Sequence, residues 1–329
     1  MSESTTGQEA SPFPQSNGHI PVQRRRIEVK GIVQGVGFRP FVYNLATQLG
    51  LTGFVGNDSR GVFIELEGPE ATLDRFYQQL TQAPPPLAWL ESVETTIVPL
   101  QHTPQFTIVQ SKPLAHAHTL VSPDLAICSD CLHELFDPAD RRYRYPFINC
   151  THCGPRFTLT KDVPYDRPLT TMAAFVMCPQ CQAEYTDPRN RRFHAQPNAC
   201  PTCGPQVHFV RAQQLPENAS ATRSELEFSG DLAIQAAQQV ISAGGIVAVK
   251  GLGGFHLACN AFNDQAVQTL RQRKGRVDKP FAVMAWDVAA VRTFAEVNAE
   301  EAALLESRER PIVLLRKRSD CPLADLVAP

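Results

Sequence analysis

The sequence predicts an α+β chain made of several domains, and three observations support this. Near the N-terminus, the hydrophobic periodicity gives the order strand-helix-strand-strand-helix-strand, which is the ferredoxin-like pattern. The middle of the chain is rich in Cys, Pro and Arg and holds four Cys-x-x-Cys pairs. The last part alternates helices and short strands, as α/β domains do. At 329 residues the chain also exceeds the usual size of one hydrophobic core, about 250–300 residues.

We therefore divide the sequence into four parts. They are a polar tail expected to be disordered (1–23), a ferredoxin-like domain (24–112), a double cysteine module (122–210) and an incomplete α/β domain (230–329). The chain stops without a terminal helix or tail signal, so we expect it to be a piece of a longer protein.

Composition excludes several classes of protein. The chain is 43% hydrophobic and 19% charged with a net charge of −2, which gives no global reason to expect a nucleic acid or an anionic membrane as partner. No apolar run approaches the roughly 18 residues of a membrane span. The N-terminus lacks the apolar core of a signal peptide, and paired thiols without an export signal are typical of metal ligands. We expect a cytoplasmic protein.

The elements of the ferredoxin-like domain follow from its apolar spacing. Glycines punctuate the loop after the first strand, and Gly50 ends the first helix. Leu73, Phe76, Tyr77 and Leu80 share one face of the second helix. The expected strands lie at residues 26–31, 52–57, 61–68 and 106–109. In the last domain we expect helices at 231–242 and 264–273, and strands at 246–249, 281–285 and 312–315.

The cysteine module is an internal repeat with a period of 50 residues. A shift of that length superposes cysteines, Asp-Pro and Arg-Arg pairs and a Gly-Pro pair without a gap. Cys128, Cys131, Asp137, Pro138, Arg141, Arg142, Cys150, Cys153, Gly154 and Pro155 match Cys178, Cys181, Asp187, Pro188, Arg191, Arg192, Cys200, Cys203, Gly204 and Pro205.

This repeat predicts two zinc sites, because two Cys-x-x-Cys turns supply the four thiolates that Zn²⁺ binds tetrahedrally. A cross-braced pairing would divide each duplicated unit between two metals, whereas sequential pairing makes each unit one complete site. Such sites are closed, so we expect a structural role. One site is assigned to Cys128, Cys131, Cys150 and Cys153, and the other to Cys178, Cys181, Cys200 and Cys203. Cys259 and Cys321 are interpreted as ordinary thiols.

The module is also rich in arginine, which leaves two interpretations. The arginines are Arg141, Arg142, Arg144, Arg189, Arg191 and Arg192. They would suit a nucleic-acid surface, but nearby aspartates and the slightly acidic chain favour a solvated or interdomain face.

A glycine-rich loop between the first strand and the first helix is a candidate anion site. In the run Val29–Pro40, glycines let backbone N–H groups converge at a helix N-terminus, and Arg39 adds a bidentate fork. Pro40 is placed at the first helical position. From spacing alone, a glycine-rich turn with a surface arginine is an equal alternative.

This loop resembles the acylphosphatase signature, and Gly53-Phe54-Val55-Gly56-Asn57 resembles its second element. The resemblance implies that Arg39 and Asn57 are catalytic, with Asn57 orienting the attacking water. It also implies phosphate binding by the loop residues Gln34, Gly35, Val36, Gly37 and Phe38. An acyl phosphate is already activated, so charge stabilisation and positioning supply the rate.

The last domain is similar to the start of a YrdC-like domain, a class that forms carbamoyl- or threonylcarbamoyl-adenylates from ATP. Basic residues around a glycine-rich turn suit a polyphosphate, although such residues are more often simply solvated. The family's nucleotide-binding positions match Lys250, Lys274 and Arg276, and we add Lys279. The family's later Ser-x-Asn element has no counterpart before Pro329.

An acylphosphatase-like domain, two four-cysteine sites and a YrdC-like start, in this order, resemble the HypF-type carbamoyltransferases of nickel–iron hydrogenase maturation. The resemblance implies hydrolysis of carbamoyl phosphate, and then ATP with Mg²⁺ as co-substrate for a carbamoyl-adenylate. It further implies carbamoyl transfer to the C-terminal cysteine of a HypE-type partner, towards the cyanide ligands of iron. We expect this chain alone to retain only the acylphosphatase-type step, with no membrane partner and no nucleic acid.

Two other functions remain open. One is a plain acylphosphatase with an accessory zinc domain. The other is an RNA-binding or tRNA-modifying protein that uses the arginine-rich zinc face and would bind RNA with a steep salt dependence.

Overall fold

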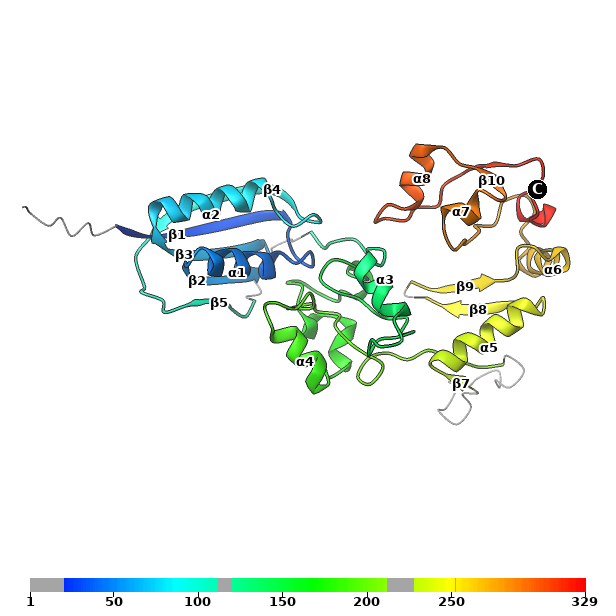
Figure 1. Ribbon diagram of the computed structural model, residues 1–329, viewed down its shortest axis with the longest axis horizontal. Coiled ribbons are helices and arrows are strands. Elements are labelled where there is room, and N and C mark those ends of the chain that lie inside the picture. The colour runs from blue at the N-terminus through cyan, green and yellow to red at the C-terminus, as the bar shows by residue number, and fades with distance from the viewer. Residues whose placement is uncertain (1–20, 112–119, 212–227, 252) are drawn as a thin grey trace, which may run out of the picture.

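The computed structural model describes residues 21–111, 120–211, 228–251 and 253–329, and the three folded parts follow one another along its long axis (Figure 1). The predicted tail at residues 1–23 lies outside the described residues except for its last three, and Val22 and Gln23 already belong to the first strand. Among the helices of the described ranges, none combines the length and the apolar character needed to cross a membrane.

A five-stranded sheet with two helices forms the first part. The strands have the order β4-β1-β3-β2-β5, and β5 is parallel to β2 while the other neighbours are antiparallel. This is the predicted ferredoxin-like domain. Its elements are β1 (Val22–Ile32), α1 (Phe38–Gln48), β2 (Thr52–Asp58), β3 (Gly61–Pro69), α2 (Glu70–Gln82), β4 (Trp89–Val98) and β5 (Phe106–Ile108).

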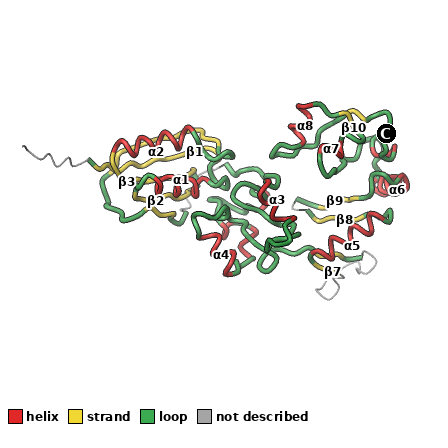
Figure 2. Tube along the Cα trace, in the orientation of Figure 1, coloured by secondary structure: helices red, strands yellow, loops and turns green. Residues whose placement is uncertain are grey.

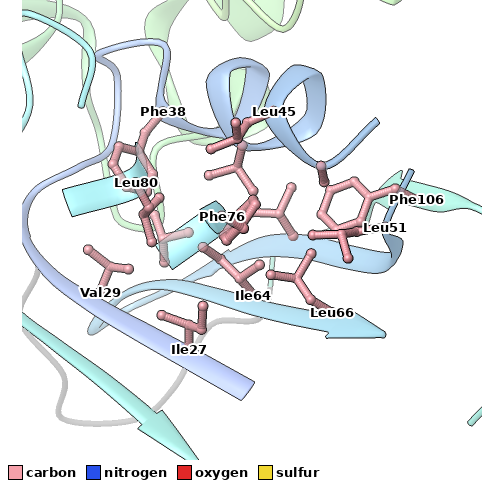
Figure 3. Close-up of a cluster of buried hydrophobic side chains, with 14 of the residues drawn as sticks. Ile27, Val29, Phe38, Leu45, Leu51, Ile64, Leu66, Phe76, Leu80 and Phe106 are labelled. Atoms are coloured by element: carbon pink, nitrogen blue, oxygen red, sulfur yellow. The ribbon is translucent and has the colours of Figure 1, made fainter. Parts of the chain in front are cut away.

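The core of this domain lies between the sheet and the two helices (Figure 3). Ile27 and Ile64 come from paired positions of β1 and β3, and Leu45, Phe76 and Leu80 from the helices meet them. All five are at most 5% exposed. The 3.6-residue period of α2 predicted Phe76 and Leu80.

Helix α1 begins at Phe38, so Pro40 is its third residue. The predicted place of Pro40, at the first position of the helix, is therefore wrong. Proline is tolerated at the third position because the first four N–H groups of a helix have no intrahelical partner. The helix cap is Gly37, whose φ of 77° is easily reached only without a Cβ.

The cysteine module contains little regular structure, and Figure 2 shows it mainly as loop. Its two helices, α3 (Ser129–Phe136) and α4 (Pro179–Thr186), start directly after Cys128 and Cys178. Short 3₁₀ helices at Phe157–Leu159, Arg167–Leu169 and Thr171–Ala174 connect the repeats. The first repeat's core is built around its thiols and includes Tyr145 and Ile148, so this segment has few apolar groups besides its cysteines.

The last part has small pieces of sheet. The helices are α5 (Asp231–Ser242), α6 (Asp264–Lys274), α7 (Val288–Val291) and α8 (Ala299–Leu305). The strands are β6 (His208–Phe209), β7 (Phe228–Ser229), β8 (Val247–Lys250), β9 (Phe255–Ala258), β10 (Ala295–Glu296) and β11 (Arg316–Lys317). A 3₁₀ helix at Asp325–Val327 packs on α6.

Two predicted strands of this part are wrong. Residues 281–285 and 312–315 are extended loop, and within the described ranges neither belongs to a strand. Several of their side chains are open to solvent, with Met284 98% and Leu314 88% exposed, whereas Phe281 is partly buried. An apolar run becomes a strand only when a neighbouring strand pairs with its N–H and C=O groups, and periodicity does not report that partner.

Candidate functional site

The eight paired cysteines gather in two groups, Cys128, Cys131, Cys150 and Cys153, and Cys178, Cys181, Cys200 and Cys203. These are the groups that the repeat predicted. Within each group the sulfur atoms lie within 4.8 Å of one another, and close Sγ–Sγ pairs are 3.5–3.7 Å apart. A tetrahedron of Zn–S bonds of about 2.3 Å has S–S edges of about 3.8 Å, so both groups fit a zinc ion. All eight thiols are free of disulfides.

The arginines of each repeat form ion pairs with a glutamate of the other repeat. Arg141 and Arg142 of the first repeat donate to the Glu184 carboxylate of the second. In the same way, Arg191 and Arg192 of the second repeat donate to Glu134 of the first. Each glutamate lies on the helix that follows the first cysteine of its repeat, which makes the two sets of ion pairs equivalent by the 50-residue shift.

Two of these arginines also donate hydrogen bonds to cysteine sulfur atoms of the other repeat. Arg141 donates to Cys181 Sγ at 3.1 Å, and Arg191 donates to Cys131 Sγ at 3.2 Å. Each repeat therefore supplies a cation to the thiolates of the other, where charge-assisted hydrogen bonds offset some of the negative charge of a four-thiolate site. Arg144, outside the repeated pairs, forms an ion pair with Asp231 of α5. These contacts favour the interdomain interpretation of the arginines.

Burial alone would raise the pKa of Glu184, but hydrogen bonds from Arg142 and Arg141 lower that pKa to about 2. Changing Glu184 to Gln removes the anion between two arginines, of which Arg142 is only 1% exposed. We expect the change to lower the free energy of opening of α3 and α4 by about 3 kcal/mol. Amide hydrogen exchange of the zinc-loaded protein measures it.

The matched control is Asp187→Asn, whose partner Arg189 is 91% exposed. Breaking an exposed pair changes stability by less than about 1 kcal/mol. If the two substitutions lowered the free energy of opening equally, the pairs between Glu184 and the arginines of the first repeat would not hold the two repeats together.

The glycine-rich loop is held from both sides. Gln34, 2% exposed, donates to the carbonyls of Asp58 and Gly61 at 2.8 and 2.9 Å, which ties the loop to the β2–β3 turn. From the cysteine module, buried Arg156 donates to the Gly35 carbonyl. The same guanidinium donates to the carbonyls of Cys150, Thr151 and Cys153. The first metal site is thus connected to the loop through one side chain.

Gly35 must be glycine for two reasons. Its φ is 75°, and a Cβ there would lie 3.2 Å from Arg156 Cδ and 3.3 Å from Tyr165 Cε1. The loop therefore combines a left-handed backbone with close packing against the cysteine module.

Arg39 and Asn57, the predicted catalytic pair, line one pocket. Arg39 is 8% exposed and pairs with Asp166 Oδ1 at 2.8 Å, and it also donates to the Tyr165 carbonyl. Asn57 is 1% exposed, and neither its Nδ2 nor its Oδ1 has a hydrogen-bond partner. A buried amide without partners costs about 1–3 kcal/mol, so it indicates a ligand that satisfies it.

The pocket lies between the first domain and the cysteine module. On the module side, sequence reasoning missed Arg156, Tyr165 and His194, and the neighbouring Asp166 that pairs with Arg39. They lie more than a hundred positions from the loop, and no motif of the sequence marks them. The lining residues of the first domain include Val33, Gln34, Gly35, Gly37, Phe38, Arg39, Pro40 and Asn57. Val36 is fully buried in the core instead.

The predicted nucleotide-binding cations lie at separate elements. Lys250 ends β8, and its Nζ lies 5.1 Å from the centre of the Phe255 ring. Lys274 ends α6, and Arg276 follows it and donates to the carbonyls of Lys279 and Pro280. Lys250, Lys274 and Lys279 are exposed. A shared nucleotide site for these four residues stays a prediction.

Models of three families match the chain. The acylphosphatase model matches residues 25–108, the HypF finger model matches 127–160 and 177–210, and the YrdC-type model described as telomere recombination matches 239–329. Carbamoyltransferase HypF2 of Cupriavidus necator is 53% identical over 298 residues, which are 90% of this chain and 36% of that protein. HypF of a Synechocystis species is 48% identical and is matched over 92% of this chain and 38% of its own length.

The chain belongs to the HypF carbamoyltransferase family. It spans a little more than a third of the length of the HypF relatives it matches. A crystal structure of full-length HypF in the phosphate- and nucleotide-bound form superposes with a TM-score of 0.84 at 46% identity, covering 95% of this chain and 39% of that one. This chain therefore consists of an acylphosphatase domain, two zinc-finger repeats and the start of a YrdC domain.

Proposed function

We propose that this chain hydrolyses carbamoyl phosphate in the pocket between its acylphosphatase domain and its zinc-finger repeats. The buried Asn57 amide, which has no partner and lies in the same pocket as the Arg39 guanidinium, carries this proposal. A carboxamide and a cation at the end of a glycine loop match a reaction that needs a positioned water and a stabilised phosphoryl group.

The chain's own groups have distinct roles in this reaction. Backbone N–H groups of the loop residues 34–38 and the guanidinium of Arg39 bind the phosphoryl oxygens at the start of α1. Asn57 orients the water that attacks phosphorus. The P–O bond to the acyl group breaks, and carbamate leaves with the electron pair of that bond. No strong base is needed, because the leaving carboxylate is a weak base.

The two metal ions have a structural role in this proposal. All four thiolates of each group are used, so a bound zinc has no open position for substrate. The ions instead fold the segment that holds Arg156 against the loop and closes the pocket.

The further HypF reactions belong to this proposal at the level of the family. Carbamate would react with ATP and Mg²⁺ at the YrdC-type domain, using Lys250, Lys274, Arg276 and Lys279, to give a carbamoyl-adenylate. The carbamoyl group would then pass to the C-terminal cysteine of a HypE-type partner, towards the cyanide ligands of a nickel–iron hydrogenase. The HypF structure in the phosphate- and nucleotide-bound form supports such a pair of ligands. We propose that this chain alone performs only the first step.

The test is phosphate release from carbamoyl phosphate by the zinc-loaded chain and its Asn57→Ala variant. We expect the variant to lose about a hundredfold in kcat, because a misplaced water costs that order of rate. Asn260→Ala, which removes a half-buried amide in the last domain far from the pocket lining, serves as control and should match the parent. A folded, zinc-loaded parent without turnover would refute the proposed function.

A further inference from the structure

Two more buried polar atoms without partners belong to residues that line the pocket, one between the zinc-finger repeats and one in the second repeat. They are the hydroxyl oxygen of Tyr165 and Nδ1 of His194. Tyr165 is 3% exposed. Neither residue belongs to the acylphosphatase domain, so neither is part of its phosphate loop.

The phosphoryl end of a bound acyl phosphate is accounted for by the loop and Arg39. An acyl phosphate also has an acyl end, and the other wall of the pocket is formed by the cysteine module. The other polar side chains of this wall are already paired. Gln196 accepts from the Arg167 amide and donates to Tyr185 Oη and to the His194 carbonyl. Arg156 donates only to backbone carbonyls. Tyr165 and His194 therefore have free hydrogen-bonding capacity on this side.

We propose that Tyr165 and His194 recognise the acyl end of the substrate, and that His194 makes the pocket selective for a carbamoyl group over an alkyl acyl group. This inference rests on the proposed hydrolysis of an acyl phosphate. A carbamoyl group has a carbonyl oxygen that accepts and an NH₂ that donates, whereas an acetyl group has a methyl in place of the NH₂. The Tyr165 hydroxyl donates to the carbonyl oxygen, and His194 Nδ1 accepts from the NH₂.

The protonation states agree with this assignment. Burial, and then the nearby Arg39 guanidinium, lowers the pKa of His194 to about 4, so its imidazole is neutral near pH 7 and can offer a lone pair. Burial raises the pKa of Tyr165, so its hydroxyl keeps its proton.

The His194 ring is also held in place. It packs edge-on against Phe193 at 4.7 Å and lies tilted against Tyr185 at 4.9 Å between ring centres, and its backbone adopts the left-handed region with a φ of 54°. The backbone N–H of His194 donates to the Tyr185 carbonyl at 3.0 Å. A fixed acceptor discriminates well, because an acetyl methyl would leave it buried and unpaired.

The experiment compares kcat/KM for phosphate release from carbamoyl phosphate and from acetyl phosphate by the full zinc-loaded chain, Tyr165→Phe and His194→Phe. Tyr165→Phe removes only the hydroxyl, and His194→Phe keeps an aromatic ring. We expect the parent to prefer carbamoyl phosphate. His194→Phe should lose about tenfold with carbamoyl phosphate and stay within about twofold with acetyl phosphate, the effect of one lost hydrogen bond. Tyr165→Phe should lose about tenfold with both substrates, because both have the carbonyl oxygen to which the hydroxyl donates.

Tyr145→Phe and His208→Phe are matched controls. Tyr145 is a buried tyrosine of the repeats whose hydroxyl donates to the Pro205 carbonyl, and His208 is an exposed histidine. Both should keep the parent's preference. The inference is overturned if the parent shows no preference, if His194→Phe lowers both substrates equally, or if Tyr165→Phe leaves both unchanged, while the proposed hydrolysis would stand. No release from either substrate by the parent would overturn both.

Discussion

Replacing Arg39 with Ala is expected to lower phosphate release from carbamoyl phosphate by about a thousandfold, as the loss of a preorganised charge-stabilising donor does. The guanidinium lies at the start of α1, is 8% exposed and is fixed by Asp166 Oδ1 at 2.8 Å. A phosphoryl group bound by the loop meets this fork without rearrangement, so its negative charge is stabilised as the bond to carbamate breaks. Steady-state kinetics with carbamoyl phosphate measure the loss in kcat/KM.

Two further variants separate charge from geometry. Arg39→Lys keeps a cation but loses the planar fork, and we expect it to recover only a small part of the activity. Arg189→Ala removes an arginine that is 91% exposed in the zinc-finger repeats and should behave as the parent. An Arg39→Ala variant that is folded and more than a tenth as active as the parent would contradict the assigned role.

Removing zinc is expected to unfold the repeats and to abolish phosphate release as well. Binding of Zn²⁺ to a four-thiolate site contributes apparent free energies of about 10–16 kcal/mol, and the first repeat has few apolar groups besides its cysteines. Arg156 is held by carbonyls of the first site and donates to the Gly35 carbonyl of the loop. Without the metal, the loop loses this contact and the pocket loses one wall.

Elemental analysis and activity measurements on Cys153→Ser test this expectation. The variant should bind one zinc instead of two and should lose most of its phosphate release. Cys259→Ser and Cys321→Ser remove thiols outside both groups and should leave two zinc ions and full activity. An unchanged metal content in Cys153→Ser, or a folded and active chain without metal, would show that the cysteines do not hold the fold together.

The two cysteine groups were predictable because both signals are local. A Cys-x-x-Cys turn brings two sulfur atoms together by itself, and the 50-residue repeat decided which turns meet. The strands and helices of the first domain were predictable for a similar reason, since alternation and helical spacing mark the faces that become its core. In the last domain the same reasoning failed at residues 281–285 and 312–315, because pairing depends on a neighbour that periodicity does not report.

Sequence alone determined the α+β class, the two groups of thiols and the loop with Arg39 and Asn57 as its candidate residues. Only the tertiary structure decided that this loop faces the cysteine module, that Arg156 connects it to the first cysteine group, and that Tyr165 and His194 line the same pocket. Likewise, only the structure showed that the arginines of each repeat pair with a glutamate of the other. The physical reason is the range of the interactions. Turns, caps and periodic faces are set by residues within a few positions, whereas a wall or an ion pair joins segments that only the packing of whole domains brings together.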